Sequence, residues 1–329
     1  MKKAEANPIT QKLQGVSEGV LCVKSVRADE NVGELFPKQF QAVPHGKGCM
    51  EVYDVFPGVT ASYNIYLATE VRFRHEVSET VLELFYCRNG RMGWNMGGGT
   101  AVYLGAGDVT VHSMTCCADS AMMFPLGFSE SLSISVDLDT LPAVCPEVLL
   151  EAGVQAGLLQ KRFCTGKPSA FPACTELEHI FAPLFSVDAS LRLPMLKVKV
   201  MELLMYLSHL APQQKELTQY FSQQTELIKE IHRQLTEHLD QRFTIEELSK
   251  QYLIDTSTLK EVFKSVYGLP IATYMREYRI HAAMKLLRET DATIADIAAQ
   301  VGYETQGKFS KAFKDVTQVL PTEFRKMQY

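Results

Sequence analysis

Three lysines lie close together near the carboxyl end of the chain, in the nine-residue stretch QGKFSKAFK at residues 306–314, which contains no acidic residue. At the spacing of an α-helix, Phe309 and Phe313 share one face, while Lys311 and Lys314 lie on the other. Ammonium groups on an exposed helix face can pair with phosphates or donate to base edges in a major groove. An ordinary solvated helix face is the alternative, and this stretch alone does not exclude it.

The residues before this stretch predict how it is held. Thr293 is a candidate N-cap for a helix that runs through Gln300. Ala298 and Ala299 are small enough to let another helix cross closely, and Gly302 supplies the positive φ that ends a helix tightly. Together these features predict a helix-turn-helix, in which the second helix crosses the first at a steep angle.

The same unit occurs twice. TIEELSKQYLIDTSTLKEVFK, which begins at Thr244, is similar to TIADIAAQVGYETQGKFSKAFK, which begins at Thr293. Between the copies, residues 271–289 contain no Gly or Pro, which predicts a continuous helix of about 28 Å. Successive major-groove faces on one side of B-DNA are about 34 Å apart. The repeat therefore predicts two reading modules on a stiff spacer, suited to two adjacent major grooves of double-stranded DNA.

The front of the chain has a different pattern. Residues 49–138 contain short segments rich in Val, Tyr, Phe and Thr, separated by turn residues, which predicts a small barrel or sandwich. Asn89-Gly90 predicts a hairpin between its flanking segments. After Pro146 the periodicity becomes helical. One helical face, which either packs on the barrel or forms a homodimer, contains Leu196, Val200, Leu203, Leu204 and Leu207.

Composition limits the class of protein. The chain has 329 residues, of which 46% are apolar, and a net charge of −5, so we expect two domains and no global basic field. It begins without the apolar core of a signal peptide, and no uncharged apolar run is long enough to span a bilayer. Eight cysteines without a CxxC pair fit reduced thiols. We therefore expect a cytoplasmic protein without a membrane partner.

The carboxyl-terminal hundred residues resemble the AraC/XylS family of bacterial transcription regulators. The motifs that carry the resemblance are LKEVFKSVYGLPIATYMREYRIHAAMKLL and IADIAAQVGYETQGKFSKAFK, the latter followed by Pro321 and EFRK. The resemblance implies an α+β protein, with a cupin-like β-barrel and following helices ahead of an all-α domain of two helix-turn-helix modules joined by a long helix. The expected domains are a sensor over residues 1–145, a helical linker and dimerisation region over 146–222, and an AraC-type DNA-binding domain over 223–329.

The resemblance also implies the DNA-contacting residues. Those of the first module are Ser257, Thr258, Lys260, Glu261 and Lys264. Those of the second module are Gln306, Gly307, Lys308, Ser310, Lys311 and Lys314. Two departures from the family pattern stand out. Gly307 replaces a serine, which removes a contact, and Thr317-Gln318 replaces an aromatic-glycine pair, so the turn after the second recognition helix is in question.

The front domain resembles the cupin-like sensor that precedes this module in the family, on the segments ELFYCRNGRMGWNM and AVYLGAGDVTVHS. Cupins that bind metal have two histidines one residue apart shortly after the first glycine, where this chain has RMGWNM. His75 and His112 are isolated, so we expect core or surface histidines, no metal site and no cofactor.

The leading hypothesis is a sequence-specific DNA-binding transcription regulator that is controlled by a small-molecule effector and contacts RNA polymerase if it is an activator. One alternative is a cupin-type metal enzyme with a helical appendage; because the chain lacks a metal triad, GxSxG and a P-loop, we expect no enzyme. The other alternative is a protein-interaction adaptor that lacks DNA binding. The effector, the operator, activation versus repression and the oligomeric state stay open.

Overall fold

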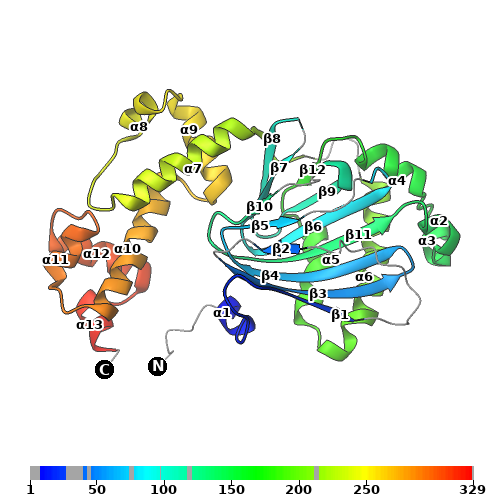
Figure 1. The fold of residues 1–329 in the computed structure, drawn as a ribbon, viewed down its shortest axis with the longest axis horizontal. Coiled ribbons are helices and arrows are strands. Elements are labelled where there is room, and N and C mark those ends of the chain that lie inside the picture. Colours follow the sequence, from blue (N-terminus) through cyan, green and yellow to red (C-terminus); the bar gives the residue numbers. More distant parts are fainter. Residues whose placement is uncertain are drawn as a thin grey trace. The chain divides into compact units, whose positions relative to one another are not determined.

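Figure 1 shows the fold in a computed structural model, which describes residues 8–26, 40–42, 46–73, 78–96, 98–116, 121–210 and 215–327. The chain divides into two compact units, Met1–Ser222 and Gln223–Tyr329. Among the described residues, no helix combines the length and the apolar character needed to cross a membrane.

The first unit is built on two β-sheets. The described strands of the larger sheet follow the order β1-β3-β4-β11-β6-β9-β12, and those of the smaller sheet follow β13-β8-β7-β10-β5-β2. The strands are β1 (Leu21–Val26), β2 (Phe40–Ala42), β3 (Lys47–Phe56), β4 (Val59–Leu67), β5 (Glu70–Phe73), β6 (Val81–Gly90), β7 (Met92–Met96), β8 (Thr100–Leu104), β9 (Val109–Ser113), β10 (Ala121–Met123), β11 (Ser129–Asp137), β12 (Ser169–Phe171) and β13 (Tyr220–Phe221). The pairing is antiparallel except for β1, which runs parallel to β3.

The larger sheet has an apolar core on each face, because alternate residues of a strand point to opposite sides. On one face Val52, Tyr66 and Cys87 pack with Trp94 and Leu104 of the smaller sheet. On the other face the sheet packs against helices α2 (Leu141–Val144), α3 (Glu147–Glu151), α4 (Ala156–Phe163), α5 (Thr175–Ser186) and α6 (Arg192–His209). Figure 1 shows α5 and α6, in green, against this face. A further helix, α1 (Pro8–Lys12), contacts β4.

Two expectations for the front of the chain need correction. The strands do not close into a barrel, because within the described residues each sheet ends at two unpaired edges, β1 and β12 or β13 and β2. The hairpin predicted at Asn89-Gly90 is wrong: β6 pairs with β11 and β9 in the larger sheet, while β7 pairs with β8 and β10 in the smaller one. Gly90 has φ of 81° and carries the chain from one sheet to the other.

Residues 146–222, which we expected to form a helical linker, contribute to the core of the first unit. The apolar face of α6 includes Val200, Leu203 and Leu207, each no more than 1% exposed, and it packs with α5 and the larger sheet. Of the two alternatives for this face, packing within the chain is the one that the structure shows. Since this face is already covered within the chain, a homodimer stays a prediction that needs another surface.

The second unit is helical. Its helices are α7 (Ser222–Glu237), α8 (Ile245–Gln251), α9 (Thr256–Tyr267), α10 (Ile271–Glu289), α11 (Ile294–Gln300), α12 (Gln306–Thr317) and α13 (Pro321–Lys326). The predicted long helix is α10, with the expected bounds. We call α8 with α9 the first module and α11 with α12 the second module.

Candidate nucleic-acid interface

The two modules share the same helix caps. Thr244 accepts a hydrogen bond from the backbone of Glu247, whose carboxylate in turn accepts from the Thr244 N–H, which makes a capping box. Thr293 and Asp296 repeat this arrangement in the second module. Since capping fixes where a helix begins, both modules present their first helix in the same way.

The second helix of each module is capped too. Asp255 accepts from the Thr258 N–H at 2.8 Å, and Thr305 accepts from the Lys308 N–H at 3.2 Å. Hydrogen bonds from Ser257 and Thr258 hold the pKa of the Asp255 carboxyl well below its usual range. Asp255 thus stays ionised at the helix N-terminus, where a negative charge is favourable.

The inward face of each recognition helix is anchored as predicted. Leu259 and Phe263 of α9, like Phe309 and Phe313 of α12, are fully buried. In the second module the two phenylalanine rings contact each other edge to face, and Phe313 contacts Phe324 of α13 in the same way. Because the anchors and their apolar neighbours fill one face, the polar side chains of both helices lie on the opposite face.

The structure places the eleven predicted contact residues at the surface of the second unit. The exposed residues are Ser257, Lys260, Glu261, Lys264, Gln306, Gly307, Lys308, Lys311 and Lys314, and the half-buried ones are Thr258 and Ser310. Lys308 donates to Glu304 at 2.5 Å, one turn earlier. Within the described residues, the other four lysines, namely Lys260, Lys264, Lys311 and Lys314, have no acidic partner. Their ammonium groups are available to an anion.

Two segments of α10 connect the modules. Near its start, Tyr274 and Tyr278 lie in an aromatic cluster with His232 of α7, Phe263 and Tyr267. Farther along, Ile280, Ala283 and Leu287 belong to the apolar core of the second module. One uninterrupted helix therefore packs into both modules, which fixes their separation within this unit.

His232 is the titratable member of that cluster. Its ring stacks on Tyr267 at 4.2 Å between centroids, and Nε2 lies 2.9 Å from the Tyr274 hydroxyl. Burial lowers the pKa of His232 to about 4, because the charged imidazolium loses its water there. The imidazole is therefore neutral at physiological pH.

Sequence patterns did not reveal a set of contacts around Gly302. A Cβ built on Gly302, which has φ of 77°, would lie 2.2 Å from the Leu239 carbonyl oxygen. Arg242 donates to the Gly302 carbonyl at 3.2 Å, and Arg279 of α10 donates to the Gln241 carbonyl at 2.6 Å. The turn of the second module is thus held against the loop that precedes the first. These contacts join residues far apart in sequence, so no local pattern marks them.

The departures from the family pattern have structural outcomes. Gln318 adopts φ of 65° at the C-cap of α12, so the left-handed turn forms without the glycine. Its side chain donates to the Asp315 carbonyl at 3.1 Å. Gly307 is exposed in the first turn of α12, and a Cβ there would meet nothing within 4 Å. Neither departure disturbs the module.

Comparisons with known proteins agree with this geometry. Residues 248–327 match the family model described as "Helix-turn-helix domain". A putative AraC-like transcription regulator of Streptomyces lividans is 37% identical over 84 residues, which cover 26% of this chain and 28% of that protein. The C-terminal unit contains an AraC-type helix-turn-helix domain.

Other relatives match the same AraC-type domain. The bifunctional transcriptional activator/DNA repair enzyme AdaA of Bacillus subtilis is 35% identical over 98 residues, covering 28% of this chain and 46% of that protein. The arabinose operon regulatory protein of Escherichia coli is 30% identical over 99 residues, covering 30% of this chain and 34% of that protein. The chain thus spans less than half the length of each of these relatives, so the likeness concerns the AraC-type domain alone.

The front unit contains the two isolated histidines of the sequence analysis, of which the structure describes one. His112 is fully buried, stacks on Phe85 at 5.9 Å between centroids and lies 3.8 Å from Glu83. The other isolated histidine, His75, lies outside the described residues. No group of three or more His, Cys, Asp or Glu side chains that could hold a metal ion occurs in the described part of the chain.

Proposed function

We propose that this protein is a sequence-specific DNA-binding transcription regulator whose AraC-type domain contacts two adjacent major grooves. The observation that carries the proposal is the duplicated recognition helix. In both copies a buried aromatic face anchors the helix, and the opposite face exposes lysines without acidic partners within the described residues. The relatives that match this domain are transcription regulators by name.

The proposed contact residues are those that the family resemblance implies, and their position at the surface supports the assignment. In the first module, Ser257, Thr258, Lys260, Glu261 and Lys264 face the duplex. In the second module, Gln306, Gly307, Lys308, Ser310, Lys311 and Lys314 do so. Lysines donate to guanine edges or to phosphates, and Glu261 can accept from a cytosine amino group. Two modules on one rigid helix read an asymmetric site, unlike a symmetric dimer of single modules.

The first unit is proposed as a cupin-like sensor for a small-molecule effector, without a cofactor and without enzymatic activity. An effector changes DNA binding only if it binds more tightly to one arrangement of the protein than to another. RNA polymerase is the further partner if the regulator activates. The protein works in the cytoplasm, and a homodimer is compatible with this function.

The test is a selection of bound duplexes from a randomised pool by the full-length protein, with and without cell extract. A recurring asymmetric motif with two blocks about one helical turn apart is expected. A single block would remove one module from the interface, and no enrichment would favour the adaptor. A motif that depends on extract would indicate an effector.

Salt dependence supplies the complementary measurement. With about six phosphates engaged, affinity for the selected duplex should fall about a thousandfold between 50 and 200 mM salt, because bound lysines release condensed counterions. A flat response would argue against phosphate contacts by these lysines.

A further inference from the structure

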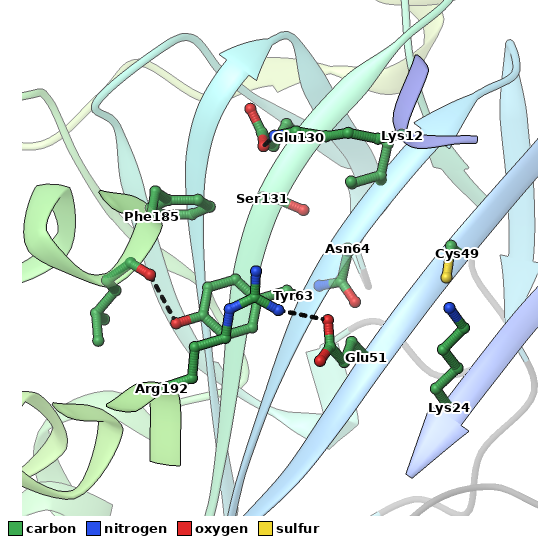
Figure 2. Close-up of a pocket in the computed structure, with 12 residues that line it drawn as sticks. Lys12, Lys24, Cys49, Glu51, Tyr63, Asn64, Glu130, Ser131, Phe185 and Arg192 are labelled. Atoms are coloured by element: carbon green, nitrogen blue, oxygen red, sulfur yellow. Dashed lines mark hydrogen bonds and ion pairs between the residues drawn. The ribbon is translucent and has the colours of Figure 1, made fainter. Parts of the chain in front are cut away.

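One cavity in the first unit has an unusual lining. It has a volume of about 260 Å³ and lies on the helix-covered face of the larger sheet, at the end where α1, β1 and the start of α6 meet (Figure 2). Its charged and polar lining includes Lys12, Lys24, Glu51, Glu130, Ser131 and Arg192. The volume is just below that of a drug-sized ligand site, so a smaller molecule would fit.

The two carboxylates of this cavity are already bonded. Glu51 accepts from the Tyr53 hydroxyl at 2.5 Å with one oxygen and from the Arg192 guanidinium at 2.8 Å with the other. Glu130, with a side chain only 7% exposed, accepts from Lys12 and, at 2.7 Å, from the Asn89 amide. Neither acid offers a free oxygen to a cationic ligand.

One donor, in contrast, is left over. Among the residues that the structure describes, Lys24 has no acidic partner. Lys12 and Arg192, which bond to Glu130 and Glu51, add two further positive charges to the lining. Three cations and two occupied acids make the lining favourable to an anion.

The opposite side of the cavity is apolar and aromatic. Tyr63 and Phe185 contact each other edge to face at 5.5 Å, and Ile65 and Leu184 complete the wall. The Tyr63 hydroxyl donates to the Leu184 carbonyl at 2.9 Å, so the ring is held in place. Figure 2 shows Lys24 on one side of the cavity and the aromatic residues on the other.

We propose that this cavity binds a small organic carboxylate, with its charged end toward Lys24 and its apolar part against Tyr63 and Phe185. The site would serve the effector role of the proposed function and rests on it for that role. Binding itself does not depend on DNA, so it can be measured separately.

The test uses three probes of similar shape and different charge on the full-length protein. Phenylacetate, phenylacetamide and phenethylamine carry negative, neutral and positive ends, and calorimetric titration without DNA compares them. Phenylacetate should bind at least about tenfold more tightly than the other two, since an ionic hydrogen bond is worth about that factor. Equal affinities, or no binding of either phenylacetate or butyrate at millimolar concentration, would overturn the proposal.

Substitutions in the cavity lining test whether phenylacetate binds there. Lys24→Gln should weaken phenylacetate binding about tenfold, because it replaces a charged donor that has no acidic partner among the described residues with a neutral one. Lys161→Gln, at an exposed position of α4 that does not line the cavity, is the matched control and should change nothing. An equal loss in the control, or none in Lys24→Gln, would exclude this site even if phenylacetate binds. Failure of DNA binding would leave these results unaffected and would count only against the regulator role.

A different observation concerns two cysteines of the same sheet. Cys22 of β1 lies directly opposite Cys49 of β3 in the parallel pairing of these strands. Both thiols are free and half-buried. Neighbouring strands lie about 4.8 Å apart, which is within the range of Cα separations that a disulfide spans.

From this register we infer that Cys22 and Cys49 form a reversible disulfide when the protein meets a peroxide. One thiolate attacks a peroxide oxygen, which gives a sulfenic acid and releases hydroxide or alkoxide. The second thiol then attacks that sulfur, forms the S–S bond and releases water. Burial raises the pKa of the Cys49 thiol, which the nearby Lys24 counteracts in part, so we expect the reaction to be slow at neutral pH.

The bond would tie the edge strand β1 to β3 next to the cavity, since Cys49 also lines it. The test treats reduced full-length protein with hydrogen peroxide, blocks the remaining thiols and maps linked peptides by mass spectrometry. A Cys22–Cys49 linkage that dithiothreitol reverses is expected. It should be absent in Cys22→Ser and in Cys49→Ser, and present in Cys145→Ser. Sulfinic acid at either cysteine without the linkage, or a linkage only to another cysteine, would overturn the inference.

Discussion

The two helix-turn-helix modules have the same architecture, yet they place glycine at different points. Each module needs positive φ twice, once in the turn between its helices and once after the recognition helix. In the first module Leu253 and Gly268 adopt these conformations, at 52° and 86°. In the second module Gly302 and Gln318 do so, at 77° and 65°. The backbone shape is kept while the residue that permits it changes.

The difference follows from what surrounds each turn. Leu253 is 94% exposed, so its side chain meets only solvent and the cost is the left-handed backbone alone. Gly302 lies against the Leu239 carbonyl, where no side chain fits. Glycine is thus required where another backbone approaches, and it is only favourable where the turn is open.

The modules also differ in their cores and surfaces. The first module packs into an aromatic cluster that includes a neutral histidine, His232 of α7, while phenylalanines dominate the core of the second module. The outward face of α9 mixes Glu261 with lysines, whereas that of α12 has lysines and no acid before Asp315. We therefore expect the second module to depend more on phosphate charge and the first to discriminate more among bases.

The largest effect is expected at the turn of the second module. Gly302→Val should destabilise this unit by about 3 kcal/mol, because a β-branched residue at positive φ adds backbone strain and the Cβ displaces the Leu239 carbonyl. Hydrogen exchange of α11 and α12 in the full-length protein measures it. Gly307→Val, at an open position, is the control and should stay within about 0.5 kcal/mol. Unchanged protection in Gly302→Val would show that the close approach is not needed.

Next in size is the loss of one lysine from the recognition surface. Lys311→Ala should weaken binding to a selected duplex by about 1–3 kcal/mol if the ammonium contacts a base edge. Fluorescence anisotropy on matched and mutated duplexes separates the two roles. A phosphate contact would give the same loss on every sequence. Lys229→Ala, on α7, controls for net charge, and an identical loss there would remove Lys311 from the interface.

A fall in pH should destabilise the first module more than the second. The folded pKa of His232 is lowered to about 4 from an unfolded value near 6.5, so the unfolded state takes up the proton first. The stability from neutral His232 is complete above pH 6.5 and is lost as the pH falls toward 4. At pH 5.5 the loss should be about 1.4 kcal/mol.

Hydrogen exchange of α9 and α10 at pH 7.5 and 5.5, corrected for intrinsic rates, measures this effect. His232→Phe keeps the stacking and removes the titration, so its protection should change less with pH. If α11 and α12 lose protection as much as α9 does, and the variant behaves like the original protein, another group is responsible.

Sequence patterns predicted the second unit closely for a physical reason. Its helices depend on local signals, such as the Thr293 cap and the spacing of Phe309 and Phe313, and the repeat shows these signals twice. The contacts among Arg242, Arg279 and Gly302 involve residues up to 60 positions apart, so nothing local specifies them. The assignment of DNA contacts to individual residues stays a prediction.

The first unit was predicted less well. Asn89-Gly90 has the composition of a hairpin turn, but the flanking strands find partners in different sheets. A two-residue signal specifies a bend, whereas pairing depends on the whole sheet. The cavity around Lys24 and the Cys22–Cys49 pair likewise depend on the register of β1 against β3, which brings together residues 27 positions apart.

The smallest effect is expected when glycine is introduced at the two positive-φ positions that lack it, Leu253 and Gln318. Leu253→Gly should stabilise the second unit by about 0.5 kcal/mol, because relief of left-handed strain slightly exceeds the entropy that glycine adds to the unfolded chain. Gln318→Gly should gain less, since it also loses the hydrogen bond to Asp315. Chemical denaturation, with hydrogen exchange to assign the transition, resolves the two.

Leu320→Gly supplies the control for this last comparison, because Leu320 is partly exposed but has φ of −77°. There glycine relieves no strain, so it should destabilise the unit. If Leu253→Gly destabilises as much as Leu320→Gly does, the exposed leucine must have a packing role that its 94% exposure does not indicate. The turn of the first module would then depend on the Leu253 side chain, whereas the turn of the second module depends on the absence of a side chain at Gly302.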